Sequence, residues 1–326
     1  MNILIVKLSS LGDVVHAMPA VQDIRAALPH AQIDWVVEKS FAPLAARCQG
    51  VRRVIPCELR RWRKAPFAAA TRTAWRAFRA DLQSQPYDAV IDLQGLSKSA
   101  LVAWAARLAP GGKRYALANQ TDGSSYERPT RWVADVAVPV PAHIHAVQRS
   151  RVLCAQALGY AVPAALNFGL VAQGAVQGAV QGAERCVALV HGTSRGDKCW
   201  PEDHWLALGR QLIAAGHTLG LPHGSADEQA RSERMAQALG LQAKVWPRLD
   251  LGALTDRLAA CAGVIGVDSG LSHIAVALDL PHVQLYNFDT AWRTGPFDAA
   301  RQRSVFAQPT PGVDAVWQAW QQVAAA

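Results

Sequence analysis

The sequence predicts an α/β protein with two doubly wound parallel sheets, and three observations predict it. Short apolar runs alternate with helical stretches, as expected where buried parallel strands alternate with helices. The alternation stops at a segment rich in glycine and alanine and then resumes. The length of 326 residues exceeds the usual size of one domain, so two domains are expected.

The first half begins with a predicted strand over residues 2–7 (NILIVK), a continuous apolar run followed by a polar turn and a segment of helical period. Further strands are predicted at 33–38 (IDWVVE) and 89–95 (AVIDLQG), with a helical stretch over 67–84 between them. This order of elements is typical of a parallel sheet with crossover helices.

The second half repeats the pattern from Cys186 onward, with strands expected in CVALVHG, HTLGLPHG, AGVIGVDSG and HVQLYNF. We therefore expect two Rossmann-like domains with a cleft between the carboxyl ends of their sheets, where ligands of such sheets bind. The repeat AQGAVQGAVQGAE predicts a linker. The expected divisions are an N-terminal domain at 1–165, a linker at 166–184, a C-terminal domain at 185–310 and an amphipathic helix at the domain junction at 311–326.

Composition limits the class of protein and its partners. A hydrophobic fraction of 51% and a charged fraction of 18% exclude a largely disordered chain. The formal net charge of +8 favours an acidic partner, which can be nucleic acid, an anionic membrane surface or a phosphorylated substrate.

The compartment is expected to be the cytoplasm. The six cysteines form no CxxC pair and no cluster at metal-ligand spacing, so buried reduced thiols and no metal site are expected. The N-terminus lacks a signal-peptide pattern, and no apolar stretch reaches the 18 or so residues of a spanning helix. Any membrane contact is therefore expected to be peripheral.

The first chemical candidate is Asp13, in the turn LSSLGD after the first predicted strand. This turn lacks the GxGxxG spacing of a dinucleotide site. A carboxylate there either caps the helix or, facing the cleft, serves as a general base. Local sequence leaves both roles open.

The second candidate is the segment 191–205 (HGTSRGDKCWPEDHW), in which a strand end is followed by Thr193, Ser194 and Lys198 and then by a helix. Hydroxyls, backbone N–H groups and a lysine together suit a phosphate. The alternative is an ordinary helix cap with a solvated lysine. Trp200 and Trp205 are expected in the core.

The third candidate is the turn in VDSGLSHIAVAL (267–278), where Asp268, Ser269 and Gly270 precede an apolar helix. Its backbone N–H groups suit a second phosphate oxygen. Asp268 can also be only a helix cap, and His273 only a core histidine.

The fourth candidate is a basic cluster formed by Arg60, Arg61, Arg63 and Lys64 around Trp62. Such runs are often plain solvated surfaces. Guanidinium groups, however, bind phosphate and carboxylate oxygens in bidentate fashion, so the cluster also suits a polyanionic acceptor.

These segments together resemble the ADP-heptose:lipopolysaccharide heptosyltransferases. The similarity rests on KLSSLGDVVHAMPA, RRWRK, YDAVIDLQGLSKSA, TSRGDKCWPEDHW, LPHGSADEQAR and VDSGLSHIAVALDLP, in chain order across nearly the whole sequence. RRWRK and SSLGDVVHAMPA look more like the members that add the first heptose, to Kdo2-lipid A, than like those that extend the core.

The resemblance implies a GT-B fold and an inverting, metal-independent transfer without a cofactor. The donor, ADP-L-glycero-β-D-manno-heptose, would bind mainly to the C-terminal half and the acceptor, Kdo2-lipid A, mainly to the N-terminal half. It also implies a peripheral location on the cytoplasmic face of the inner membrane and no nucleic-acid partner.

Site residues follow from the same resemblance, position by position. Asp13 is expected as the catalytic base and Lys198 as the group that stabilises the leaving diphosphate. Glu228 is expected on the ADP ribose, although it can equally be an exposed helix glutamate. The expected donor-binding residues are Ser10, Gly12, Thr193, Ser194, Lys198, Glu228, Leu249, Asp268, Ser269, Gly270, Leu271 and His273. The expected acceptor-binding residues are Lys7, Ser9, Arg60, Arg61, Arg63 and Lys64.

Two departures and two alternatives accompany this reading. Ser194 and Ser269 stand where the family pattern has threonine, and the loop 286–296 (YNFDTAWRTGP) differs from the family's loop. A second-heptose or later-core heptosyltransferase would share the donor site but not need the basic cluster. A basic nucleic-acid-binding protein is the alternative from another class.

Overall fold

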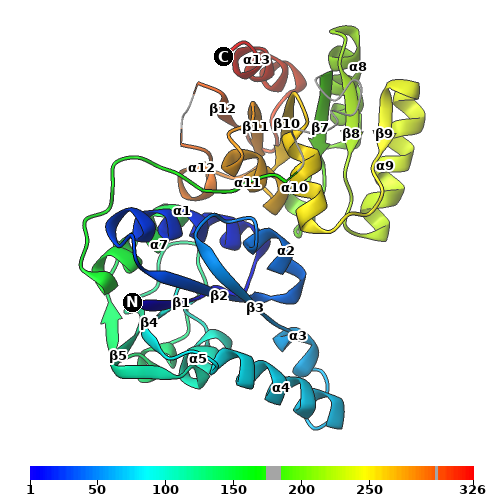
Figure 1. The fold of residues 1–326 in the computed structure, drawn as a ribbon. Coiled ribbons are helices and arrows are strands. Elements are labelled where there is room, and N and C mark those ends of the chain that lie inside the picture. Colours follow the sequence, from blue (N-terminus) through cyan, green and yellow to red (C-terminus); the bar gives the residue numbers. More distant parts are fainter. Residues whose placement is uncertain (174–184, 298–299) are drawn as a thin grey trace. The chain divides into compact units, whose positions relative to one another are not determined.

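The computed structural model describes residues 1–173, 185–297 and 300–326, which divide into two compact units, Met1–Leu170 and Val171–Ala326 (Figure 1). The cleft expected between them stays a prediction. Residues 174–184, which hold most of the repeat and of the predicted linker, lie outside the described residues. The domain boundaries drawn from the sequence likewise stay predictions.

The N-terminal unit contains a parallel sheet of six strands, as far as the described residues go, in the order β3-β2-β1-β4-β5-β6. This is the order of a doubly wound sheet, whose first and fourth strands are neighbours at its centre. The strands are β1 (Asn2–Val6), β2 (Gln32–Glu38), β3 (Val51–Cys57), β4 (Tyr87–Asp92), β5 (Leu108–Leu117) and β6 (Val136–Val138).

Helices cover both faces of this sheet (Figure 1). Helices α1 and α7 pack together on one face, and α3 to α6 share a buried apolar cluster with the strands on the other. Trp62, Phe78 and Val102 belong to this cluster, with Val133 packed against it. The helices are α1 (Leu11–Ala27), α2 (Ala42–Ala45), α3 (Leu59–Trp62), α4 (Ala69–Leu82), α5 (Ser97–Ala105), α6 (Thr130–Val133) and α7 (Ala146–Leu158).

The C-terminal unit has the same strand order, because β9-β8-β7-β10-β11-β12 becomes the first order when its strands are numbered from β7. The strands within the described ranges are again parallel. They are β7 (Cys186–Val190), β8 (Thr218–Leu221), β9 (Ala243–Val245), β10 (Gly263–Val267), β11 (His282–Tyr286) and β12 (Gln302–Phe306).

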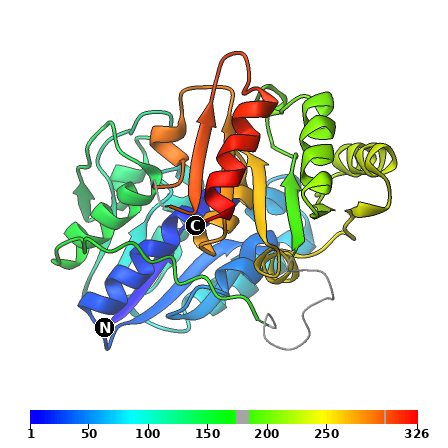
Figure 2. The ribbon, with the colours of Figure 1, turned by 90° about the horizontal axis from the view of Figure 1, so that it is seen from above.

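The last helix, α13 (Val313–Ala324), packs against α8, β11 and β12 of its own unit, as Figure 2 shows. Val316 and Trp320 join Trp200 and Trp205 in the unit's core, which confirms the prediction for the latter two. The expected place of this helix at the domain junction stays a prediction. The other helices are α8 (Glu202–Ala214), α9 (Ala226–Leu239), α10 (Leu251–Ala259), α11 (Gly270–Ala277) and α12 (Ala291–Thr294).

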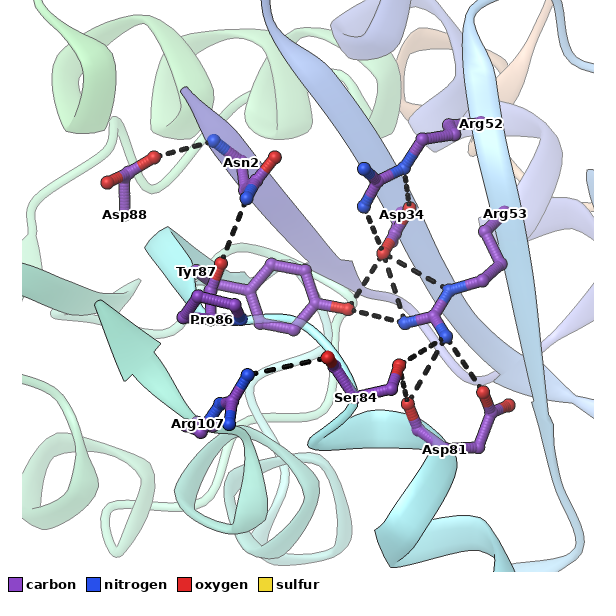
Figure 3. A network of polar contacts seen from close by, with 10 residues as sticks. All are labelled: Asn2, Asp34, Arg52, Arg53, Asp81, Ser84, Pro86, Tyr87, Asp88 and Arg107. Atoms are coloured by element: carbon purple, nitrogen blue, oxygen red, sulfur yellow. Dashed lines mark hydrogen bonds and ion pairs between the residues drawn. The ribbon is translucent and has the colours of Figure 1, made fainter.

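A polar network ties the amino ends of the first four strands together (Figure 3). The fully buried Asp34 carboxylate accepts hydrogen bonds from the guanidinium groups of Arg52 and Arg53 and from the Tyr87 hydroxyl, at 2.8 to 3.3 Å. Burial by itself would raise the pKa of Asp34, but these partners hold it below its usual value. This network therefore strengthens the end of the sheet away from the carboxyl ends where ligands are expected.

The structure also bears on the predictions about the cysteines and about a membrane-spanning helix. All six cysteines are free thiols, but Cys186 and Cys199 are only half-buried, so the expectation of burial is wrong for these two. Cys186 is the first residue of β7, and Cys199 lies after the turn that follows β7, where the chain reaches the surface of its unit. No helix in the described part of the chain is long and apolar enough to cross a membrane.

Candidate active site

Asp13 lies in the first turn of α1, which a short turn connects to the carboxyl end of β1. Its Oδ2 accepts hydrogen bonds from both the backbone N–H and the hydroxyl of Ser10, each at 3.0 Å. Asp13 therefore does cap the helix, as one of the two sequence readings held. Ser10, expected to bind the donor, points its hydroxyl at this carboxylate.

The second carboxylate oxygen faces two cations. Asp13 Oδ1 lies 3.5 Å from Lys7 Nζ and 3.7 Å from an Nη2 of Arg149, a residue of α7. The Lys7 side chain is only 1% exposed, and its ammonium also donates to the Leu93 carbonyl at 3.0 Å. A helix cap needs no such pair of buried cations, so capping alone does not explain this arrangement.

The charges of this cluster depend on one another. Burial by itself would raise the pKa of Asp13, but the Lys7 ammonium, the Ser10 N–H and the Arg149 guanidinium hold it well below its usual range. Burial also lowers the pKa of Lys7 to about 8, against the opposing effect of Asp13. Asp13 is therefore ionised at neutral pH, which is the state that a general base requires.

Lys98, which the sequence analysis did not single out, connects this turn to the basic cluster. It lies in the first turn of α5, after the carboxyl end of β4, and its Nζ donates to the Ser9 hydroxyl at 2.9 Å. Its pKa is lowered by burial and then by the positive charge of Arg60. Glu38, whose pKa burial raises, accepts the backbone N–H of Arg60 at 3.2 Å.

The basic cluster follows the carboxyl end of β3, so it lies at the same edge of the parallel sheet as Asp13 and Lys98. Trp62 packs into the core against Trp75 and Phe78, which fixes α3. Arg61 pairs with Glu58 at 3.1 Å. The four cations of the cluster are themselves exposed: Arg60, Arg61, Arg63 and Lys64.

In the C-terminal unit, the two turns singled out in the sequence meet at Asp268. Lys198 Nζ donates to Asp268 Oδ2 at 2.5 Å, and the Thr193 hydroxyl donates to the Asp268 carbonyl at 3.3 Å. His273 Nε2 lies 3.5 Å from Asp268 Oδ1. The side chain of His273 thus belongs to the same polar cluster, and a plain core histidine does not describe it.

This cluster carries opposite charges and an unused hydroxyl. Burial alone would raise the pKa of Asp268, but His273 and Lys198 hold it well below its usual range. Ser269 stands just before α11, whose first residues are Gly270 and Leu271. Its buried Oγ has no hydrogen-bond partner among the described residues. A hydroxyl and helix N–H groups beside a lysine form a suitable site for an anionic oxygen.

Glu228 is a half-buried residue of α9, and it is not the free surface glutamate of the alternative reading. Its Oε2 accepts the Gly224 N–H at 2.6 Å, while its backbone N–H is capped by Ser225. The carboxylate also lies against Gly192, where a Cβ would come within 2.5 Å of Oε1. Glu228 is therefore held beside the turn that follows β7.

Asn287, in the loop that departs from the family pattern, holds the segment that carries Lys198. Its Nδ2 donates to the carbonyls of Asp197 at 2.9 Å and Cys199 at 3.0 Å, on either side of the lysine. Ser194 is exposed and Leu249 is half-buried ahead of α10, so their roles rest on the resemblance alone. Among the described residues, no group of three or more His, Cys, Asp or Glu side chains can hold a metal ion.

The chain is similar in sequence and in fold to known proteins. The model of glycosyltransferase family 9 (heptosyltransferase) matches residues 75–313, well over half of the chain. The chain belongs to glycosyltransferase family 9. The GT-B fold expected from the sequence is confirmed by the Escherichia coli heptosyltransferase WaaC solved with ADP, which matches with a TM-score of 0.88 and 34% identity over 98% of both chains.

Relatives within family 9 differ in their distance from this chain. Lipopolysaccharide heptosyltransferase 1 of Escherichia coli K12 is 39% identical over 290 residues, which cover 88% of each chain. The Pseudomonas aeruginosa protein of the same name is 40% identical over 298 residues, covering 91% of this chain and 81% of the relative. Lipopolysaccharide heptosyltransferase 2 of Escherichia coli K12 is only 28% identical over 298 residues, covering 88% and 82%.

Proposed function

We propose that this family 9 glycosyltransferase transfers L-glycero-D-manno-heptose from ADP-heptose to Kdo2-lipid A, as the first heptose of the lipopolysaccharide core. The observation that carries the proposal is the meeting of Lys198, Thr193 and the start of α11 at Asp268, an arrangement that suits phosphate oxygens. The choice of the first heptose rests on the higher identity to heptosyltransferase 1 than to heptosyltransferase 2.

The donor would bind to the C-terminal unit. In this proposal, Lys198, Thr193, the unused Ser269 hydroxyl and the α11 N–H groups hold the diphosphate, and Glu228 accepts hydrogen bonds from the ribose hydroxyls. His273, next to Asp268, completes the sugar side of the site. Positive charge from Lys198 and the helix would stabilise the ADP that leaves, so neither a metal nor a cofactor is invoked.

The chemical step would begin at Asp13. Its carboxylate accepts the proton of a Kdo hydroxyl, and the hydroxyl oxygen forms a bond to the anomeric carbon of the heptose. The bond from that carbon to the diphosphate breaks on the opposite face, and its electron pair leaves with ADP. Attack from the face opposite the leaving group inverts the anomeric carbon.

The acceptor would bind to the N-terminal unit. The exposed cluster of Arg60, Arg61, Arg63 and Lys64 would bind the lipid A phosphates and Kdo carboxylates. Lys7 and Ser9 were also expected to bind the acceptor, but both are buried, at 1% and 3% exposure. We therefore assign them to positioning, Lys7 toward Asp13 and Ser9 toward Lys98, and assign Lys98 itself to an acceptor anion.

The acceptor carries acyl chains, so it resides in a membrane. On this proposal the protein works at the cytoplasmic face of the inner membrane as a peripheral protein. The net charge of +8 is explained by anionic substrates and an anionic membrane surface, without a nucleic acid.

Transfer from ADP-L-glycero-β-D-manno-heptose to Kdo2-lipid A in the presence of EDTA tests the proposal. We expect formation of ADP and of singly heptosylated product, and no comparable activity on an acceptor that already carries the first heptose. Faster transfer to the latter would assign the protein to a later step. No transfer to either acceptor, with oligonucleotide binding that falls steeply with salt, would favour nucleic-acid binding.

The contact between Gly192 and Glu228 gives a separate prediction for the donor site. We expect Glu228→Gln to raise the KM for the donor by about tenfold to a hundredfold, because hydrogen bonds to a charged acceptor are weakened. Gly192→Ala should act in the same direction, since its Cβ would push the Glu228 carboxylate aside. Steady-state kinetics with varied donor measures both effects.

Gly224→Ala is the matched control, because its Cβ would meet Glu228 only at 3.4 Å, an ordinary contact, and its N–H is retained. Its KM for the donor should stay near that of the wild type. An unchanged KM in both Glu228→Gln and Gly192→Ala would show that Glu228 is not a donor ligand.

A further inference from the structure

An exposed apolar surface lies on the N-terminal unit, outside the candidate site. Leu101 and Trp104, one turn apart on α5, are 45% and 62% exposed, and Trp132 on α6 is 84% exposed. We call these three side chains the aromatic ridge. Single exposed apolar residues are ordinary, but two exposed tryptophans on helices that pack together need a reason.

The two helices are joined at both ends of α6. Before α6, the Glu127 carboxylate accepts the Ser97 N–H at 2.7 Å at the start of α5. After α6, Asp135 accepts the Arg114 N–H at 2.7 Å. The Arg114 guanidinium donates to the Ala103, Trp104 and Ala106 carbonyls at the end of α5, at 3.0 to 3.2 Å. These hydrogen bonds hold α5 and α6 together, so the aromatic ridge lies on two adjacent helices that are fixed to each other.

The charges around the ridge are mostly positive. Arg107 follows α5, while Arg128 and Arg131 lie just before and within α6, and all three are exposed. The nearby carboxylates of Glu127 and Asp135 are already engaged in the hydrogen bonds that join the helices. Within the described ranges these arginines have no carboxylate partner, so an incoming anionic surface would displace none.

The neighbouring helices extend this positive surface. Residues 59–80 contain no Asp or Glu, and their cations are Arg60, Arg61, Arg63, Lys64, Arg72, Arg76 and Arg79. Helices α3 and α4 share their buried cluster with α5 and α6, so they cover the same face of the sheet (Figure 1). Phe67, just ahead of α4, is 87% exposed.

We propose that the outer surface of α4, α5 and α6 docks on an anionic phospholipid bilayer, with Trp104 and Trp132 inserted at the headgroup level. Tryptophan favours the membrane interface because its ring is apolar and its N–H can reach water. Arginines beside it attract anionic headgroups, and each contributes a modest, salt-sensitive increment. A second copy of the chain would bring like charges together. The inference rests on the proposed function only for its purpose, which is to place the unit next to a lipid acceptor.

Sedimentation with vesicles tests the docking without any need for activity. We expect the wild type to bind vesicles that contain phosphatidylglycerol and to bind neutral phosphatidylcholine vesicles much less, with binding that falls as salt rises. The double variant Trp104→Ser/Trp132→Ser should bind at least tenfold more weakly. Arg128→Glu/Arg131→Glu should bind anionic vesicles at least tenfold more weakly as well.

Matched controls lie on the C-terminal unit. Leu241→Ser removes a side chain that is 94% exposed, and Arg210→Glu reverses an exposed charge on α8. Both should bind vesicles like the wild type, and thermal unfolding should show that all variants are folded. Equal binding by wild type and ridge variants would overturn the proposal. Loss of self-association in the tryptophan variant, with unchanged vesicle binding, would overturn it in favour of a subunit interface.

Kinetics separates this inference from the proposed function. With an acceptor stripped of its acyl chains, the ridge variants should keep the wild-type rate, because none of the changed residues is assigned to the catalytic base or to the acceptor site. With acylated acceptor in anionic vesicles, their rate should fall. Absence of transfer by the wild type would count against the proposed function and leave the vesicle result to decide the docking.

Discussion

Replacing Asp13 by asparagine is expected to lower kcat by about 10³- to 10⁴-fold, while the melting temperature stays close to that of the wild type. The amide oxygen can still accept the Ser10 N–H and hydroxyl, which now bind Oδ2 at 3.0 Å, so the cap of α1 is retained. The amide cannot accept a proton from the acceptor hydroxyl. Single-turnover assays with saturating donor measure the effect.

Asparagine also separates the two roles of Asp13. If the carboxylate only caps the helix, this variant should keep most of its activity and Asp13→Ala should lose mainly stability, by about 0.5–2 kcal/mol. Near wild-type kcat in Asp13→Asn would therefore exclude the general base.

The pH profile of a Lys7→Met variant adds an independent readout on the same base. In the wild type, Lys7 opposes the upward effect of burial on the pKa of Asp13 and helps to hold that pKa well below its usual range. Without Lys7 the pKa of Asp13 rises, and kcat should decline as the pH falls through that raised value. An unchanged acid limb would contradict the coupling of Lys7 and Asp13.

The second large effect is expected at Lys198. Lys198→Ala should lower kcat/KM for the donor by about 10²- to 10³-fold, because the developing charge on the ADP leaving group loses its cation. The variant also leaves the Asp268 carboxylate, now 2.5 Å from Lys198 Nζ, without its lysine partner next to the diphosphate. Calorimetry with ADP and steady-state kinetics separate weaker binding from a slower chemical step.

Lys244→Ala is the control for this prediction, since it removes an exposed lysine of the same unit, on β9. It should leave both ADP affinity and kcat unchanged. Wild-type ADP affinity together with wild-type kcat in Lys198→Ala would show that another group neutralises the leaving diphosphate.

The elements that could be predicted from sequence are those whose pattern is local. The apolar runs at 2–7, 33–38 and 89–95 match β1, β2 and β4 closely, and the helical stretch 67–84 matches α4. Strand β5 (LAPGGKRYAL) was not singled out. A proline and two glycines interrupt its apolar pattern, and its register shifts where it pairs with β4.

The site residues likewise divide into those that a local pattern predicts and those that it does not. Asp13, Lys198 and Asp268 lie in the segments that follow β1, β7 and β10, so the rule that ligands meet the carboxyl ends of parallel strands points to them. Lys98 follows β4 and the same rule would have found it. Arg149 lies on a helix far along the chain from Asp13, and nothing near it in the sequence announces the contact.

Each unit holds a lysine next to an aspartate, Lys7 with Asp13 and Lys198 with Asp268. For the Lys198–Asp268 pair, this means that ADP competes with Asp268 for the lysine. On the proposed function, a diphosphate that binds must compete for the ammonium with a carboxylate already in contact with it. The observed free energy of ADP binding then reflects the difference between the free energies of two ion pairs. After heptose has been transferred, the ion pair between Asp268 and Lys198 can form again. Its formation favours release of ADP and a new turnover.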